Sequence, residues 1–136
     1  MADGIYNNLK SDLLNGNIDL GSGGDTIKVA LLDNTHSFSA TDSVWSDVSA
    51  NEISGTGYTA GGATLANQSI SGTTTVKLDG DNVAWSSATF TAYHIVLYDT
   101  TNSNSLICSF DLGGAKTVAS GTFTIQWNAS GILTIA

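Results

Sequence analysis

Hydrophobic residues recur at every second position in several short segments after residue 24, and this period limits the chain to a fold of β-strands. In residues 25–33 (DTIKVALLD) the alternation places Ile27, Val29 and Leu31 on one face of a strand. Three later segments predict hairpins: residues 73–85 with a turn at 79–82, residues 92–111 with a turn at 101–104, and residues 121–136 with a turn at 128–131. About seven or eight short strands are therefore expected, arranged as an all-β antiparallel β-sandwich or a jelly-roll-like barrel.

The polar residues of the chain suit strands and turns. Of its 136 residues 12% are charged and 41% are hydrophobic, while Ser, Thr, Asn and Gly supply most of the remaining polarity. Lys, Glu and Arg are the usual residues of helix surfaces, so their scarcity favours sheet over helix. A chain of this length suits one domain with a single modest core.

The N-terminal segment differs from the rest, because residues 3–15 carry the apolar spacing of a short helix. Asp3 can cap this helix and Gly16 can end it. Its apolar stripe comprises Ile5, Tyr6, Leu9, Leu13 and Leu14. A glycine-rich link follows. We therefore expect an N-terminal helix and flexible arm at residues 1–24 and a β-sandwich domain at residues 25–136.

The glycine-rich stretch at residues 51–62 (NEISGTGYTAGG) matches the spacing of a dinucleotide-binding loop, Gly-x-Gly-x-x-Ala. That loop works only when a helix follows it, because the amides of the helix N-terminus hold the pyrophosphate. The sequence after Gly62 is rich in Thr, Ser and β-branched residues and has no helical period. We therefore interpret Gly55, Gly57, Gly61 and Gly62 as positions of close backbone approach or positive φ, and we expect no cofactor.

The charge of the chain argues against two classes of partner. Twelve acidic residues against four basic residues give a formal net charge of −8. Such a surface repels phosphate backbones and anionic membranes, so neither nucleic acid nor a membrane is an expected partner. The first ten residues (MADGIYNNLK) have no apolar signal core, and no stretch approaches the length of a membrane span.

Residues with catalytic or metal-binding chemistry are few. His36 and His94 are the only histidines, Cys108 lies in an apolar run that predicts a buried thiol, and their spacing matches no zinc pattern. Residues 79–82 (DGDN) indicate a turn rather than a calcium loop. No nucleophile elbow is present, and nothing favours a catalytic triad assembled from distant residues. We expect no enzyme activity, no catalytic residue and no metal. A glycan hydrolase would need two carboxylates facing each other across a cleft.

Two aromatic residues lie in irregular sequence and are candidates for a binding surface. Residues 34–55 lack a clear period and predict a long loop with one helical turn at 42–48; Trp45 lies in it, and Tyr58 follows it. An exposed aromatic side chain in a loop can anchor a protein partner or stack on a sugar. The other interpretation is that both cover an edge of the sandwich.

Six segments of the chain, taken in order, resemble a family of small structural proteins of tailed bacteriophages. They are GIYNNLKSDLLNGNIDL, DTIKVALLD, SDVSANEISGTGYTAGGATL, DNVAWSSATFTAYHIVLYD, LICSFDLGG and GTFTIQWNASGILTI. The resemblance covers nearly the whole chain, and NEISGTGYTAGG is its most specific element. Proteins of this size and make-up are similar to capsid decoration, or cement, proteins, which bind outside an assembled head shell and lock neighbouring capsomers together. That family carries no catalytic residues.

The resemblance implies a virion protein on the capsid exterior, synthesised in the host cytoplasm, with the major capsid protein and copies of itself, as a dimer or trimer, as partners. The candidate interface residues are Ile5, Tyr6 and Leu9 in the arm and Trp45, Gly57 and Tyr58 in the loops. The alternative function is a tail- or fibre-associated module that binds a host surface glycan through Trp45 and Tyr58.

Overall fold

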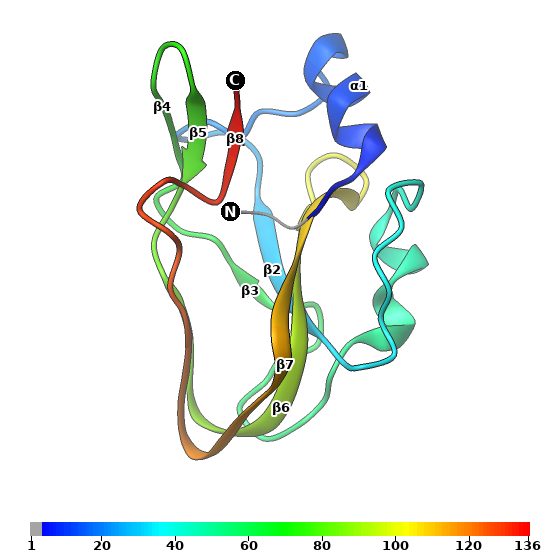
Figure 1. Cartoon of the computed structure of the whole chain (residues 1–136), viewed down its shortest axis with the longest axis vertical. Coiled ribbons are helices and arrows are strands. Elements are labelled where there is room, and N and C mark those ends of the chain that lie inside the picture. The colour runs from blue at the N-terminus through cyan, green and yellow to red at the C-terminus, as the bar shows by residue number, and fades with distance from the viewer. Residues whose placement is uncertain (1–3) are drawn as a thin grey trace.

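Two antiparallel sheets and one short α-helix make up the computed structural model, which describes residues 4–136 (Figure 1). The elements are β1 (Gly4–Ile5), α1 (Asn7–Asn15), β2 (Ile27–Leu32), the 3-10 turns η1 (Trp45–Asp47) and η2 (Ser49–Asn51), β3 (Ala63–Thr64), β4 (Ser69–Ser71), β5 (Val76–Asp79), β6 (Val83–Asp99), β7 (Ser105–Ile125) and β8 (Leu133–Ile135). The larger sheet has the order β1-β7-β6-β2-β3 and the smaller one β4-β5-β8. The predicted all-β, sandwich-like fold is confirmed, and its jelly-roll form stays a prediction.

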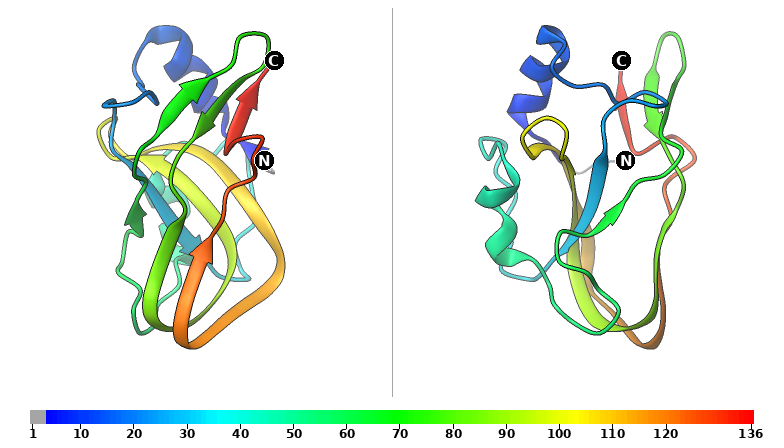
Figure 2. Two further views of the ribbon diagram at one scale, coloured as in Figure 1. Left: turned by 90° about the vertical axis from the view of Figure 1, so that its left-hand side faces the viewer. Right: turned by 180° about the vertical axis from the view of Figure 1, so that it is seen from behind.

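The long strands β6 and β7 form a two-stranded ribbon that bends back on itself. They pair from Val83↔Ile125 to Asp99↔Ser105, with three register shifts between Trp85 and His94 and a fourth between Leu97 and Tyr98. Each shift leaves extra residues on one strand without a partner on the other, which bends and twists the ribbon locally. The two halves of the ribbon consequently face each other: one half lies beside β2, and the other continues toward β5 and β8 (Figures 1 and 2).

The main core fills the space between these two layers. Its buried residues from β2 and from the β2-side half of the ribbon include Ile27, Val29, Leu31, Ile95, Leu97, Ile107 and Cys108. Those from the facing layer include Leu78, Trp85, Phe90, Ile132 and Leu133. The predicted inward face of residues 25–33 is therefore confirmed.

A second cluster covers the outer face of the same sheet. It comprises Tyr6, Ala30, Leu32, Val48, Val96, Tyr98 and Leu106, with Trp45 packed against it. The segment with η1 and η2 lies over this face (Figure 2). One helical turn was expected at 42–48, and the structure has a 3-10 turn within this range, η1, and a second one, η2, directly after it. Because β2 is covered on both faces, its alternate residues Ala30 and Leu32 are also apolar.

One of the three predicted hairpins is confirmed. The strands on either side of residues 101–104 pair, with Tyr98 opposite Leu106. The other two predictions are wrong, because β5 pairs with β4 and β8, whereas Val83 of β6 pairs with Ile125 of β7. Residues 79–82 and 128–131 therefore cross from one sheet to the other. Asp, Gly and Asn suit such a crossing as well as a hairpin turn, so local composition does not specify the partner strand.

The helix begins later than predicted. Gly4 and Ile5 pair with Ser109 and Cys108 of β7, so α1 begins at Asn7, with Tyr6 as its N-cap residue. Backbone pairing with β7 replaces the first turn expected from the apolar spacing. The predicted cap, Asp3, lies outside the described residues. Gly16 ends the helix as predicted, in the left-handed conformation at φ +70°.

The N-terminal segment packs against the body of the protein rather than standing apart from it as an arm. Leu9, Ile18 and Leu20 belong to the main core. The hydroxyl of Ser105 also donates a hydrogen bond of 2.7 Å to Oδ2 of Asp12 in α1. Residues 4–24 thus contribute buried apolar surface to the same core as the sheets.

Candidate functional site

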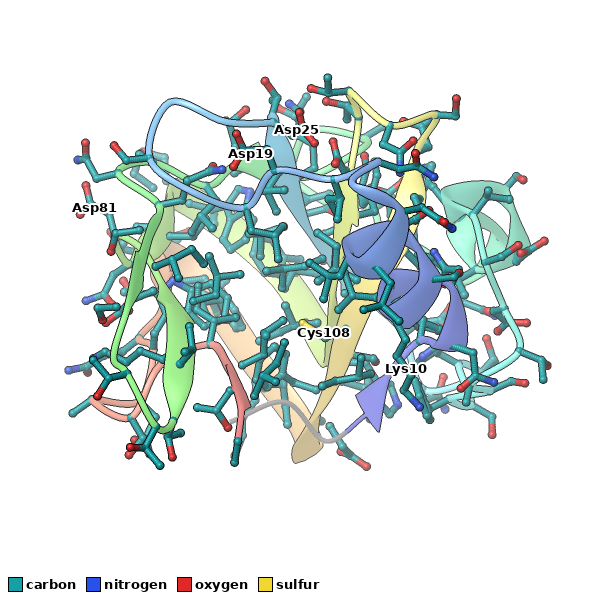
Figure 3. All side chains as sticks on the ribbon, turned by 90° about the horizontal axis from the view of Figure 1, so that it is seen from above. Lys10, Asp19, Asp25, Asp81 and Cys108 are labelled. Atoms are coloured by element: carbon teal, nitrogen blue, oxygen red, sulfur yellow. The ribbon has the colours of Figure 1, made fainter. Side chains whose placement is uncertain are left out.

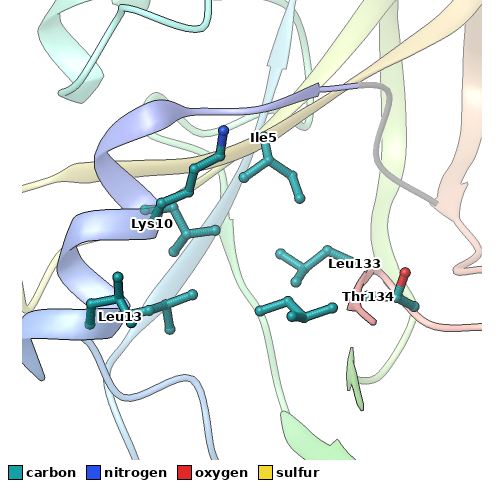
Figure 4. Close-up of a pocket in the computed structure, with 8 residues that line it drawn as sticks. Ile5, Lys10, Leu13, Leu133 and Thr134 are labelled. Atoms are coloured by element: carbon teal, nitrogen blue, oxygen red, sulfur yellow. The ribbon is translucent and has the colours of Figure 1, made fainter. Parts of the chain in front are cut away.

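An apolar groove of about 370 Å³ lies between α1 and β8. Figure 4 shows Lys10 and Leu13 on the helix side and Leu133 and Thr134 on the strand side. The full lining is Ile5, Leu9, Lys10, Leu13, Leu14, Leu133, Thr134 and Ile135. Six of these eight residues are aliphatic, so the groove offers apolar contact and almost no hydrogen-bonding groups.

The groove continues into a second hollow of about 260 Å³ between α1 and the small sheet. Leu13, Leu133 and Ile135 line both hollows. Three large aliphatic side chains around them are open to solvent: Leu14 is 91% exposed, Ile135 51% and Ile70 46%. An exposed apolar region of this kind, on a surface that is otherwise mainly polar, marks an interaction site.

The local sequence explains how the groove forms. In α1, Leu9 and Leu13 are four residues apart and lie on one face, which packs toward the core. Leu14 follows directly and is rotated away from that face. In β8 the side chains alternate, so Leu133 and Ile135 lie on one face and Thr134 on the other. Leu133 is buried in the core, whereas Ile135 is 51% exposed at the end of the strand. The helix and the strand thus contact each other through their buried residues, and the apolar groove lies between their more exposed side chains.

The structure brings only two of the predicted interface residues into this groove. Ile5 and Leu9 line it, although Leu9 is almost fully buried. Tyr6 belongs to the outer cluster, where its ring lies 5.0 Å from that of Phe38. Burial raises the pKa of Tyr6 to about 12. Tyr6 is fully buried within its own chain and offers no surface to a partner.

The two predicted aromatic residues do not form one site. Trp45 stacks on Tyr98 with ring centroids 4.6 Å apart, on the outer face of the large sheet. Tyr58 instead packs against the main core, and its hydroxyl is hydrogen-bonded to the Leu31 amide and to Glu52. Burial is the main cause that raises the pKa of Tyr58. Both side chains therefore pack within this chain, Trp45 on the outer face of the large sheet and Tyr58 against the main core.

The glycine-rich stretch is a loop packed closely on the sheet. Gly57, Gly61 and Gly62 have positive φ, and a Cβ atom added to Gly62 would lie 2.1 Å from the carbonyl oxygen of Val29. A strand, β3, follows the loop where a dinucleotide site needs a helix. The interpretation of these glycines as positions of close approach and positive φ is confirmed. Gly57 is exposed and distant in sequence from the groove residues.

The sequence reasoning missed most of the groove. Leu13 and Leu14 were assigned only to a helix stripe, Leu133 and Ile135 only to a predicted strand, and Ile70 to no element. The adjacent leucines at the end of α1 were one usable signal, since a helix cannot bury two successive side chains on the same narrow face. In β8, no sequence feature indicated that an apolar side chain would be exposed.

Two histidines meet in a polar hollow elsewhere on the molecule. The rings of His36 and His94 are 5.0 Å apart, edge to face, beside Ser109 and Asp111. Burial, and then His94, lower the pKa of His36. Within residues 4–136 no group of three or more His, Cys, Asp or Glu side chains is placed to hold a metal ion.

Cys108 is a free, fully buried thiol, as predicted. Its side chain lies in the interior of the protein (Figure 3). Burial raises its pKa, which keeps the thiol protonated and inert.

No helix in the described part of the chain has the length and apolar character needed to span a membrane. Comparisons of the chain with protein-family models, with curated proteins and with solved structures found no match.

Proposed function

We propose that this protein is a structural component of a tailed-bacteriophage virion, which binds the outside of the assembled capsid and holds neighbouring capsomers together. The identity of the virion rests on the sequence resemblance described above. The mode of action rests on the structure, through the apolar groove between α1 and β8. The proposal assigns no catalytic role to any residue.

The groove is the observation that supports an attachment role. Its walls are aliphatic, and Leu14, Ile70 and Ile135 stand exposed around it. Burying such side chains against a partner releases about 25 cal/mol for each Å² of apolar surface removed from water. A protein that binds the assembled shell better than free subunits stabilises the shell by mass action.

The rest of the molecule suits a rigid module. The folded-back β6–β7 ribbon encloses the main core, and the second cluster covers the outer face of the large sheet. Preorganised surfaces of this kind lose little conformational entropy on binding. A net charge of −8 is compatible with the outside of a shell, where the protein need not meet packaged DNA.

The proposal is tested by immunogold electron microscopy of the phage particles whose genome encodes this chain. Antibody against the purified protein is expected to label the head surface evenly. Label confined to the tail would replace the proposal with the host-binding function. Unlabelled particles contradict a virion role, provided that the same antibody binds the protein when it is adsorbed to a bare grid.

A further inference from the structure

One edge of the small sheet is open beside the groove. In the order β4-β5-β8, strand β8 pairs with β5 through Leu133, Thr134 and Ile135. No strand within residues 4–136 pairs with its other side. An unpaired strand edge presents a row of N–H and C=O groups that another extended segment can bind.

The groove runs along this open edge. Its walls are β8 on one side and α1 on the other (Figure 4). In a strand, alternate side chains point to the same face. A segment added to β8 would therefore direct every second side chain into the apolar groove. Leu14 and Ile135, now largely exposed, would be covered by it.

Lys10 gives the lining of this groove a positive charge. Within residues 4–136 its ammonium group has one hydrogen-bond partner, Oδ1 of Asn7 at 3.5 Å. Among the described residues, the one ion pair joins Lys77 to Asp79, so Lys10 has no carboxylate partner there. A carboxylate on the bound segment would complement this charge.

The overall charge disfavours a second copy of this chain as the occupant. Each copy carries a formal charge of −8, so two copies repel each other as they approach. The groove, with its lysine, is instead suited to a segment of a different protein.

We propose that the groove between α1 and β8 binds an extended segment of another protein, which adds a strand to β8, inserts aliphatic side chains beneath α1 and places a carboxylate beside Lys10. The attribution of that segment to a capsid subunit rests on the proposed function. The aliphatic and acidic character of the segment is argued from the groove lining and Lys10 alone.

Two matched synthetic peptides test this inference on the full chain. Both contain alternating valine and threonine; one ends in glutamate and the other in lysine. Backbone amide resonances of the labelled protein are followed by NMR during titration. The acidic peptide is expected to shift resonances of β8 and α1 and to bind with a Kd on the order of 10–100 µM, and the basic peptide about tenfold more weakly.

Three variants define the site. Leu14→Asp, at a position that is 91% exposed, should fold normally and weaken binding of the acidic peptide by about tenfold or more. Lys10→Glu should reverse the preference between the two peptides. Ser54→Asp is the matched control: it adds the same negative charge at an exposed position outside the groove lining and should leave binding unchanged.

Several results would overturn the inference. They are the absence of saturable binding of either peptide, an unchanged preference in Lys10→Glu, and shifts located away from β8 and α1. Sedimentation showing a wild-type dimer that Leu14→Asp dissociates would assign the groove to a second copy instead. If antibody labelled the phage head but neither peptide bound, only the addition of a strand to β8 would be rejected. If the peptide bound but the particles stayed unlabelled, only the virion role would be rejected.

Discussion

The hydroxyl of Tyr58 donates a hydrogen bond of 2.8 Å to Oε1 of Glu52. The same hydroxyl accepts one from the backbone N–H of Leu31 at 3.0 Å, and Oε1 of Glu52 also accepts the N–H of Gly61 at 2.6 Å. Strand β3 pairs with β2 only at Lys28 and Val29, so Tyr58 satisfies a backbone group of β2 beyond the end of β3. This network holds the glycine-rich loop against the sheet.

Replacement of Tyr58 by phenylalanine should lower the free energy of unfolding by about 1–3 kcal/mol, because it leaves the Leu31 amide and the Glu52 carboxylate without this partner. Urea unfolding measures the change. Tyr93→Phe is the control, since no hydrogen bond of the Tyr93 hydroxyl is present in the described part of the chain, and it should cost less than about 0.5 kcal/mol. Equal losses in the two variants would show that the network contributes nothing.

Gly62→Ala should destabilise the protein by more than about 3 kcal/mol, because it adds both backbone strain and a steric clash. Gly62 has φ +83°, and its new Cβ would meet the Val29 carbonyl at 2.1 Å. Gly23→Ala separates the two effects: Gly23 has φ +76° and open space around it, so only the strain of about 1 kcal/mol is expected. Thermal and urea unfolding of both variants check this difference, and similar losses would argue against close packing at Gly62.

Local features of the chain were predictable from its sequence. The buried face of β2, the turn at 101–104 and the end of α1 at Gly16 all follow from neighbouring residues: alternation, turn formers, and a glycine after an apolar stripe. Each depends on interactions within a few positions, which a single sequence displays directly.

Strand partners and the bend of the ribbon were not predictable in this way. The middle of β6–β7 contains Ser86, Ser87, Gly113 and Gly114, whose small or polar side chains interrupt the alternation, so one long ribbon was divided into separate short strands. The choice between a hairpin and a crossing at residues 79–82 depends on packing against distant residues such as Trp127, whose indole N–H donates to the carbonyl of Asp81 at 2.8 Å. The groove depends on the same tertiary arrangement.

Leu9 and Leu14 occupy the same helix but should respond differently to truncation. Leu9 is 1% exposed and Leu14 is 91% exposed. Leu9→Ala should cost about 2–5 kcal/mol in unfolding free energy, because it removes buried methyl groups and leaves a cavity. Leu14→Ala should change stability by less than about 0.5 kcal/mol. If Leu9→Ala were as neutral as Leu14→Ala, α1 would not belong to the cooperative core in solution.

Asp99 is a fully buried carboxyl at the end of β6. Its Oδ1 accepts the backbone N–H groups of Thr101 at 2.8 Å and Asn102 at 3.2 Å. Burial, and then the adjacent carboxyl of Asp25, raise the pKa of Asp99 to about 6. Asp25 lies beside Asp19 on the rim of the protein, and Oδ2 of Asp25 accepts the N–H of Asp19 at 2.8 Å (Figure 3).

The sign of the resulting pH dependence follows from linkage. A carboxyl whose pKa rises from 3.8 in the unfolded chain to about 6 in the fold favours folding in its protonated form, so its contribution is full below about pH 4 and is lost as the pH rises through 6. Asp99→Asn keeps an acceptor for Thr101 and Asn102 but does not ionise. The difference in unfolding free energy, Asp99→Asn minus wild type, should therefore rise by up to about 3 kcal/mol as the pH rises from acid to neutral. Urea unfolding across this pH range measures the difference.

Asp47→Asn is the control of opposite sign for this experiment. The backbone N–H groups of Ser43 and then Val44 lower the pKa of Asp47, so its stabilisation is present above the unfolded pKa of 3.8 and is lost as the pH falls through the lower value in the fold. Asp47→Asn should have a lower free energy of unfolding than the wild type at neutral pH, and this difference should shrink as the pH falls. Parallel pH profiles for the wild type and Asp99→Asn would mean that the buried carboxyl titrates in the fold as it does in the unfolded chain, and that neither burial nor Asp25 perturbs it.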